Sequence, residues 1–522
     1  MSSILLFSFV IGYFLLLLIV AYYTSRNSNN ESFFIGNRNS NWMLVAFGMI
    51  GTSLSGVTFV SVPGTVGGSG FAYFQVVIGY LIGYMIIAFV LLPLYYKLNL
   101  TSIYNYLQHR FGMVSYKTGA LFFIISRTLG ATARLFLVIN VLQLFILEKM
   151  GVPFAVTTFV ILLMILLYTF EGGVKTIVFT DTLQTTFMLL GLVVCIVYIM
   201  SNVGHSVTST LSELTGKGLT RIFNTDINSS SYFLKHIIGG MFITVAMTGL
   251  DQEMMQKNIS VKRLKDSQKN MITFSITMAI VNFLFLLLGG LLFLFAEKSG
   301  IKVAPDDLFP TVALSYMPTA VAIIFIIGLI SALFPSADGA LTALTSSFCI
   351  DILGLKRKED WDEKKRKRIR LTVHFTFAVI FFIAVMGFKY MDNKSIIDVI
   401  LKVAGFTYGP LLGLFAFGIL SKRKINDRLA LYVCLAAPVL ILGIDIINNI
   451  EWYEKQLKFE GNWVSEIKRL SQSLFGSFKI GYELLIYNGI LTYIGLLSIS
   501  QKTSGDQPLR HTREAKIEAD VQ

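Results

Sequence analysis

Long apolar runs recur along almost the entire chain, and their length restricts the possible folds more than any other feature. The hydrocarbon core of a bilayer is about 30 Å thick, so a helix needs about 20 mainly apolar residues to cross it. About thirteen runs approach this requirement: residues 3–23, 43–64, 71–97, 116–146, 153–170, 177–201, 232–256, 271–297, 318–347, 370–389, 396–420, 428–449 and 479–500. With 54% hydrophobic and only 14% charged residues, the chain is predicted to be an all-α polytopic membrane protein.

Basic residues are concentrated in a few short loops, which predicts the orientation of the spans. Lysine and arginine are abundant in residues 257–270, 354–370 and 421–428, whereas 65–70 has none and 390–396 has only Lys394. Short loops rich in these residues stay in the cytoplasm. An odd number of spans then places the N-terminus outside and the C-terminus in the cytoplasm. The net charge of +13 is therefore explained mostly by these basic cytoplasmic loops, and no nucleic-acid partner is expected.

The run 43–64 contains a stretch of glycines and hydroxyl side chains, Gly51-Thr52-Ser53-Leu54-Ser55-Gly56. Glycine weakens a helix and frees its backbone carbonyls, and serine and threonine place hydroxyls beside them. A broken helix is tolerated in hydrocarbon only where protein or a polar cavity surrounds it. Because discontinuous helices near the midplane build the sites of secondary transporters, we predict that this stretch binds a cation or a polar solute. The alternative is that the small residues only let two helices pack closely.

A proline lies in a second polar stretch, within the run 318–347. Pro335 removes a backbone donor and should leave a carbonyl near Ser331 without its helical partner. Ser336 and Asp338 add a hydroxyl and a carboxylate nearby. Together these oxygens could replace the hydration shell of a monovalent cation. The alternative is a kink that the neighbouring serines and threonines satisfy.

Two arginines lie well inside the run 116–146. Arg127 and Arg134 are spaced i, i+7, so both lie on one face of a helix. An arginine near the middle of the membrane is costly and normally faces a partner or a cavity. A guanidinium offers a bidentate fork to a carboxylate, which makes both residues candidates for binding an acidic solute. The alternative is an internal ion pair with Asp181 or Asp338.

No pattern of catalytic or energy-converting residues is found. The three cysteines, Cys195, Cys349 and Cys434, lie in or at the ends of apolar runs and suggest neither disulfides nor a metal site. The chain has no Walker loop and no dinucleotide fingerprint. Neither ATP-driven transport nor an enzymatic activity is therefore expected.

Five motifs, in this order along the chain, resemble the sodium:solute symporter family. They are Phe34-Ile35-Gly36-Asn37-Arg38, the broken helix from Thr52 to Gly64, Thr180-Asp181, Gly249-x-Asp251-Gln252-x-x-x-Gln256, and Ser336-Ala337-Asp338-Gly339-Ala340-Leu341 followed by Asp351. The likeness covers roughly residues 5–450. It implies the five-plus-five inverted-repeat fold of the leucine transporter, with an extra N-terminal helix.

This resemblance divides the chain into five parts. They are an extra helix and cytoplasmic linker (1–42), a first repeat (43–201), a second repeat (232–420), two C-terminal helices (428–500) and a cytoplasmic tail (501–522). The first apolar run lacks a basic leader and a cleavage site, so we expect a retained span and not a signal peptide.

Sodium is the coupling ion that the resemblance implies. In the family it lies between the unwound first core helix and the eighth core helix. Carried over by position, its ligands are the carbonyls of Gly51, Leu54 and Ala332 and the hydroxyl of Ser336. The family usually has another hydroxyl just before Ser336, and this chain has Pro335 there.

The resemblance leaves a second sodium site open. Some members build one from an aspartate matching Asp181 and from hydroxyls matching Asp338 and Gly339. An acid and a glycine stand at the last two positions in this chain. The inner aromatic gate of the family aligns with Met247, which is a further departure.

We therefore expect a sodium-coupled secondary active symporter that imports a small polar solute and is a monomer in the lipid bilayer. Solute contacts are expected from the broken helix, the next span and the two arginines: Ser53, Ser55, Thr58, Gln75, Arg127 and Arg134. The arginines favour a sugar acid such as sialic acid over a neutral sugar or an amino acid. A proton-coupled carrier, a channel and a membrane sensor of the same fold are alternatives. Residues 501–522 are too few for the kinase or receiver domain of a sensor.

Overall fold

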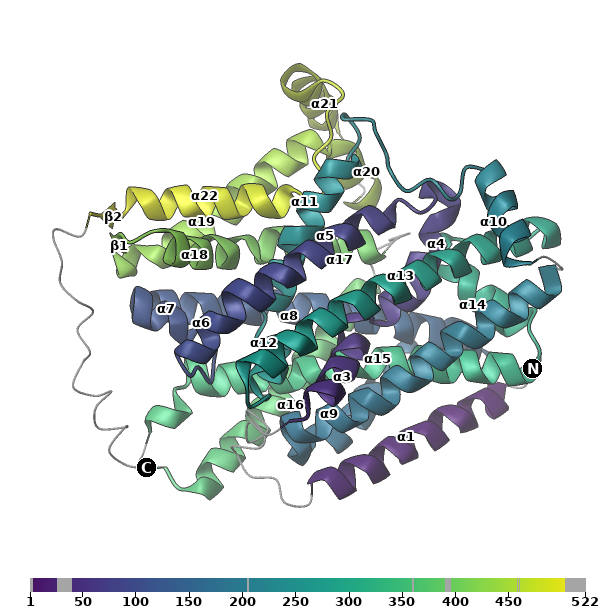
Figure 1. Ribbon diagram of the computed structural model, residues 1–522, viewed down its shortest axis with the longest axis horizontal. Coiled ribbons are helices and arrows are strands. Elements are labelled where there is room, and N and C mark those ends of the chain that lie inside the picture. Colours follow the sequence, from purple (N-terminus) through teal and green to yellow (C-terminus); the bar gives the residue numbers. More distant parts are fainter. Residues whose placement is uncertain are drawn as a thin grey trace.

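The computed structural model describes residues 3–25, 40–203, 206–358, 361–389, 396–457, 459 and 461–502, with the side chains of 170–175 outside the description. The linker motif Phe34-Ile35-Gly36-Asn37-Arg38 and residues 503–522 of the predicted tail lie outside the described residues. Within them the fold is helical, apart from one antiparallel pair of two-residue strands (Figure 1).

The helices of the first half follow in this order: α1 (Ser3–Ser25), α3 (Trp42–Ser53), α4 (Gly56–Ser69), α5 (Tyr73–Ile86), η2 (Ile87–Leu91), α6 (Leu92–Lys97), α7 (Asn105–Arg110), α8 (Met113–Leu142), η3 (Gln143–Leu147), η4 (Glu148–Met150), α9 (Phe154–Val203) and α10 (Val207–Gly216). Within the described residues, η2 and η3 are π-helical segments, and so are Val245–Gly249 (η5) and Phe348–Ile352 (η6) in the second half.

The second half contains α11 (Phe233–Thr244), η5 (Val245–Gly249), α12 (Gln252–Ile259), α13 (Leu264–Ser299), α14 (Pro305–Ser315), α15 (Thr319–Ser347), η6 (Phe348–Ile352), η7 (Leu355–Arg357), α16 (Glu363–Phe388), α17 (Ile396–Thr407), α18 (Gly409–Leu420), β1 (Lys424–Ile425), α19 (Asp427–Asn448), α20 (Ile450–Leu457), α21 (Asn462–Phe475), α22 (Leu484–Ser498) and β2 (Ser500–Gln501).

Many of these helices have the length and hydropathy of membrane spans. Among the described residues, eight single helices could cross a membrane, or up to 11 if each bent pair counts as one span. Two shorter apolar helices, Phe154–Thr169 and Leu484–Ser498, coincide with two further predicted runs. The protein is thus a multi-pass membrane protein, while the predicted count of about thirteen spans stays a prediction.

Three bent helix pairs interrupt the spans. α3 and α4 meet at 57°, α11–η5 and α12 at 65°, and α17 and α18 at 47°. The first break was predicted from its glycines and lies at Leu54 and Ser55, where α3 ends and α4 begins. At this break the N–H of Leu54 donates to the carbonyl of Ile50, and the next backbone hydrogen bond runs from the N–H of Phe59 to the carbonyl of Ser55. The carbonyls of residues 51–54 are therefore left without a helical partner.

Two prolines lie inside helices without ending them. α4 continues through Pro63 to Ser69, so the outer turn that Pro63 and the glycines up to Gly70 indicate is made only at its end, at Gly70. Gly70 has φ +57°, and a Cβ there would lie 2.9 Å from the carbonyl oxygen of Leu219, which explains a glycine at this turn. α15 also runs unbroken through Pro335, and the hydroxyl of Ser336 donates to the carbonyl of Leu333 at 2.9 Å.

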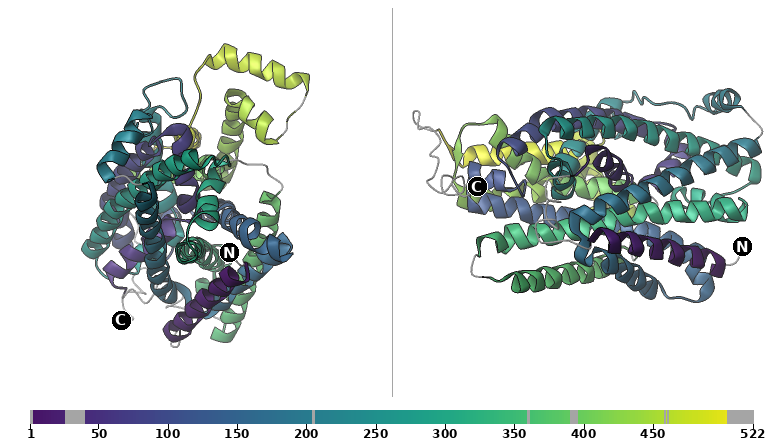
Figure 2. Two further views of the ribbon diagram at one scale, coloured as in Figure 1. Left: turned by 90° about the vertical axis from the view of Figure 1, so that its right-hand side faces the viewer. Right: turned by 60° about the horizontal axis from the view of Figure 1, so that its bottom comes forward.

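Helix α15 is the centre of the packing. It lies along α9 and α8, and its residues from Phe325 to Ser347 are all buried except Ile327. On its outer side α1 packs against α9 and α15, as the purple helix at the lower edge of Figure 1 shows. α5 and α11 form another close pair, and α18, α19 and α22 pack together at the opposite side. Helix α21 stands off this body at the top of Figure 1 and in the left view of Figure 2.

One predicted boundary is corrected. The runs 153–170 and 177–201 both lie along α9, where they match the apolar helices Phe154–Thr169 and Thr176–Asn202. Lys257, counted above with the basic loop, is instead part of α12, and its side chain is only 4% exposed. A lysine so deeply buried needs a partner, and therefore it belongs with the interior charges described next.

Candidate functional site

A cavity of about 100 Å³ lies beside the break between α3 and α4. Five of the six predicted solute-binding residues line it: Ser53, Ser55, Thr58, Arg127 and Arg134. Tyr73, Tyr80 and Tyr84 of α5 form an aromatic wall, and Asn282 of α13 adds an amide. The aligned gate position, Met247 of η5, lines the same cavity. The broken helix thus provides hydroxyls, α8 provides cations and α5 provides aromatic rings.

Gln75, the sixth predicted residue, does not line this cavity. Its amide nitrogen donates to the carbonyl of Ala72 at 2.9 Å and lies 3.3 Å from Nδ1 of His236. Its amide oxygen accepts from the backbone N–H of Asn224 at 3.1 Å. Gln75 therefore fastens the segment before α11 to the start of α5.

The two arginines of α8 have different surroundings. Arg127 is buried, donates to the carboxylate of Glu253, and has Oδ2 of Asp251 3.9 Å from its Nη1. Among the described residues, Arg134 has no carboxylate within ion-pair distance, although it lines the same cavity. Arg127 thus has the internal ion pair that was weighed above, but with Glu253 and Asp251 as partners and not Asp181 or Asp338. Arg134 keeps its guanidinium available to the cavity.

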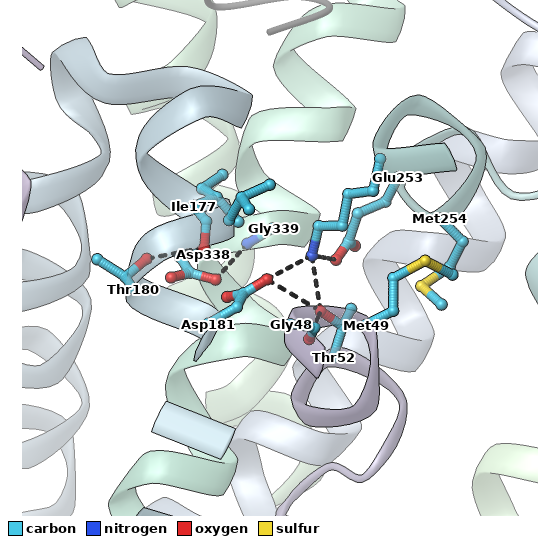
Figure 3. Close-up of polar contacts among 12 residues, drawn as sticks. Gly48, Met49, Thr52, Ile177, Thr180, Asp181, Glu253, Met254, Asp338 and Gly339 are labelled. Carbon is cyan, nitrogen blue, oxygen red and sulfur yellow. Dashed lines mark hydrogen bonds and ion pairs between the residues drawn. The ribbon is translucent and has the colours of Figure 1, made fainter. Parts of the chain in front are cut away.

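The two acids of the possible second sodium site, Asp181 and Asp338, have separate partners. Oδ2 of Asp181 lies 2.7 Å from Nζ of Lys257 and accepts from Oγ1 of Thr52 at 3.2 Å. Oδ2 of Asp338 accepts from the hydroxyl of Tyr168 at 2.6 Å. Figure 3 shows Asp181, Thr52 and Glu253 turned toward one point, with Asp338 to one side.

The four predicted sodium ligands lie on two helices that pack against one another. Gly51 and Leu54 are at the end of α3, and Ala332 and Ser336 are on α15. All four are buried. The unpaired carbonyls at the break and the Ser336 hydroxyl are hard oxygen donors, which suit a small monovalent cation.

Sequence reasoning missed three residues of this region: Glu253, Lys257 and Tyr168. The first two are spaced i, i+4 on α12, where Asp251 caps the helix by accepting from Met254 N–H at 3.2 Å. The unusually polar segment after Thr248 was a signal for them, because such residues rarely follow an apolar run unless they are partnered inside the protein. Tyr168 had no comparable signal.

Helices broken beside a cavity with polar lining residues are how secondary transporters build their binding sites. The model of the sodium:solute symporter family matches residues 33–436, and the chain belongs to this family. The resemblance found in the motifs is thereby confirmed. The protein is a sodium-coupled transporter of a small solute and not an enzyme.

Relatives and solved structures agree with this assignment. The sodium/sialic acid symporter NanT of Aliivibrio fischeri is 24% identical over 449 residues, covering 82% of this chain and 84% of the relative. The sodium/sialic acid symporter SiaT of Proteus mirabilis is 23% identical, with 80% of this chain and 84% of the relative covered. The human sodium/iodide cotransporter is also 23% identical, over 78% of this chain and 66% of its own length.

The fold is similar to that of a sodium-coupled sialic acid symporter solved in a substrate-bound outward-open state. The TM-score is 0.78 at 19% identity, with 95% of this chain and 99% of that chain covered. A nucleobase-cation-symport-1 family transporter matches with a TM-score of 0.53 at 13% identity, over 95% of this chain and 99% of that one. At these identities the similarity concerns the fold alone.

Proposed function

We propose that this protein imports a small carboxylate-bearing sugar, with sialic acid as the leading candidate, together with sodium. The observation that carries the proposal is the guanidinium of Arg134. It lines the cavity at the helix break and has no carboxylate partner among the described residues. Arg134 is half-buried, and a guanidinium that faces an enclosed cavity without a carboxylate partner is available to pair with a carboxylate of the solute.

The rest of the cavity suits a sugar acid. Ser53, Ser55 and Thr58 offer hydroxyls that can donate to and accept from sugar hydroxyls. The tyrosine wall of α5 supplies flat apolar surface for the ring of the solute. Two relatives named as sodium/sialic acid symporters support this choice of solute. Arg127, paired with Glu253, is assigned to the buried ion pairs and not to direct contact with the carboxylate of the solute.

Sodium is proposed to bind between α3 and α15, with the carbonyls of Gly51, Leu54 and Ala332 and the hydroxyl of Ser336 as ligands. A sodium ion bound between α3 and α15 would hold the end of α3 in place and so determine the shape of the cavity beside it. The ion and the solute then stabilise the same conformation, which is the thermodynamic condition for coupling them. One positive charge that moves inward across 100 mV contributes about 2.3 kcal/mol.

The wider architecture is part of the same proposal. We assign two inverted repeats, residues 43–201 and 232–420, about thirteen spans, and two C-terminal helices within 428–500. The basic loops favour an external N-terminus and a cytoplasmic C-terminus. We propose a monomer as the transporting unit.

Uptake by proteoliposomes tests this function. With an inward sodium gradient, wild-type protein should concentrate labelled sialic acid but not its uncharged methyl ester. Arg134→Gln should reduce the preference for the acid by about tenfold or more, as expected for a lost charge-assisted hydrogen bond. Arg134→Lys should restore part of it.

The same assay separates the alternatives. Uptake driven only by a proton gradient would establish a proton-coupled carrier. A wild-type preference for a neutral sugar or an amino acid would replace the sugar acid. An Arg134→Gln variant that keeps the full preference would show that this arginine does not contact the carboxylate.

A further inference from the structure

The ammonium group of Lys257 lies beside the aspartate that a second sodium ion would require. Its Nζ atom is 2.7 Å from Oδ2 of Asp181 and 2.6 Å from Oγ1 of Thr52. Oε1 of Glu253 lies 3.5 Å away. Three side chains on α9, α3 and α12 thus direct oxygens at a single cation, as the convergence of Asp181, Thr52 and Glu253 in Figure 3 shows.

The positions that would complete a second sodium site are altered as well. A Cβ on Gly339 would lie 2.2 Å from Oε1 of Glu253, so that carboxylate occupies the space that a hydroxyl-bearing side chain would need. The carboxylate of Asp338 is engaged by the hydroxyl of Tyr168 and by the N–H of Gly339. The missing side chain at Gly339 is therefore what allows Glu253 to approach Lys257.

Lys257 also belongs to a row of charges of alternating sign. Asp251, Arg127, Glu253, Lys257 and Asp181 follow one another, and every neighbouring pair is within 4.0 Å. All five side chains are 5% exposed or less. Each buried charge in this row thus has a neighbour of opposite sign inside the protein. A mobile cation at Asp181 would face the ammonium at close range, and like charges repel most strongly where water is excluded.

We propose that Lys257 is a tethered cation that fills the second cation position, so that no second sodium ion binds at Asp181. The inference rests on the sodium-coupled function proposed above, because it concerns the number of ions in that cycle. A single sodium ion, held between α3 and α15, then accompanies the solute. Lys257 balances Asp181 at every stage and never leaves the protein.

Counting bound sodium ions in purified protein tests this assignment. Saturation binding of radioactive sodium is measured without solute, so the readout does not depend on transport. Wild-type protein is expected to bind one ion. Lys257→Met keeps an unbranched side chain but removes the charge, and it should bind one ion more. Adding Asp181→Asn to Lys257→Met should return the number to that of wild type.

Lys262→Met is the matched control, because Lys262 lies five residues further on and is exposed. It should bind the same number of ions as wild type. Two ions in wild-type protein would overturn the proposal, and so would an unchanged number in folded Lys257→Met. If Lys257→Met does not fold, the wild type and the neutral pair Lys257→Met/Asp181→Asn decide, since both must bind a single ion.

Failure of the proposed function would look different. It would appear as wild-type proteoliposomes that take up no solute in a sodium gradient. A wild type that binds no sodium would remove the site between α3 and α15. In either case, one ion gained by Lys257→Met and lost again in the double variant would still assign the second position to Lys257.

Discussion

Arg127 of α8 donates to Glu253 of α12, and this contact decides which of the two cavity arginines is left for a solute. Glu253 also faces Lys257 one turn further along α12. The carboxylate of Glu253 is therefore paired with two buried cations. Arg127 lines the cavity, and Lys257 lies beside Asp181.

Removing the charge of Arg127 should destabilise the protein more than removing that of Arg134. Arg127→Met leaves Glu253 without one of its two cations, and breaking a buried ion pair typically costs about 3–5 kcal/mol. Arg134→Gln should cost far less because no carboxylate is left behind. The thermal unfolding temperatures of the two purified variants are compared with that of wild type. Equal losses would contradict the different roles of the two arginines.

Ser336→Ala should weaken sodium binding between α3 and α15. The hydroxyl is one of the four proposed ligands, and losing one such contact should raise the sodium concentration for half-maximal uptake about three- to tenfold. Ser498→Ala, in an exposed position on α22, is the control and should change nothing. An unchanged sodium dependence of Ser336→Ala would remove its side chain from the site.

Gly339→Ala should disturb the buried charges without adding or removing one. The new methyl group would meet Oε1 of Glu253, so that carboxylate must shift away from Lys257. Forcing extra volume into a packed interior typically costs about 1–3 kcal/mol. Gly387→Ala on α16 is the control, because nothing lies within 4 Å of a Cβ there. If both variants unfold at the wild-type temperature, Glu253 is not confined as the structure indicates.

Gln75→Ala should lower stability and leave solute preference unchanged. The substitution leaves the partly buried backbone N–H of Asn224 without its partner, and the cost should lie near the lower end of the about 1–3 kcal/mol expected for a buried donor. Unfolding temperature and the ratio of acid to ester uptake are measured on the same preparation. A changed ratio would place Gln75 in the solute path after all.

The first break was predictable because the segment from Gly51 to Gly56 places glycines and hydroxyl side chains inside an apolar run, and these residues weaken a helix locally. Pro335 looked equally disruptive, yet α15 continues through it, since a helix packed on several sides can tolerate one missing donor. Local composition therefore indicated where a helix could break but not whether its neighbours would hold it together.

The partners of the charges were less predictable than the charges themselves. The cost of Arg127 in an apolar run was evident, but its partner Glu253 comes from a helix far away in the chain. Lys257 was attributed to a cytoplasmic loop because a lysine at the end of an apolar run usually marks one. Only the path of α12, which turns inward after Leu250, shows it to be an interior residue.

The small β1–β2 pair has a mechanical consequence. Lys424 pairs with Gln501 and Ile425 with Ser500, so the start of α19 and the end of α22 are tied to one another. Next to this tie, Asp427 accepts hydrogen bonds from the N–H and the hydroxyl of Ser115 at the beginning of α8. Because both helices are joined at this end and fixed there to the start of α8, sliding them lengthwise past α8 would break these contacts. Any displacement of α19 and α22 that keeps the contacts must therefore grow with distance from residues 424–427.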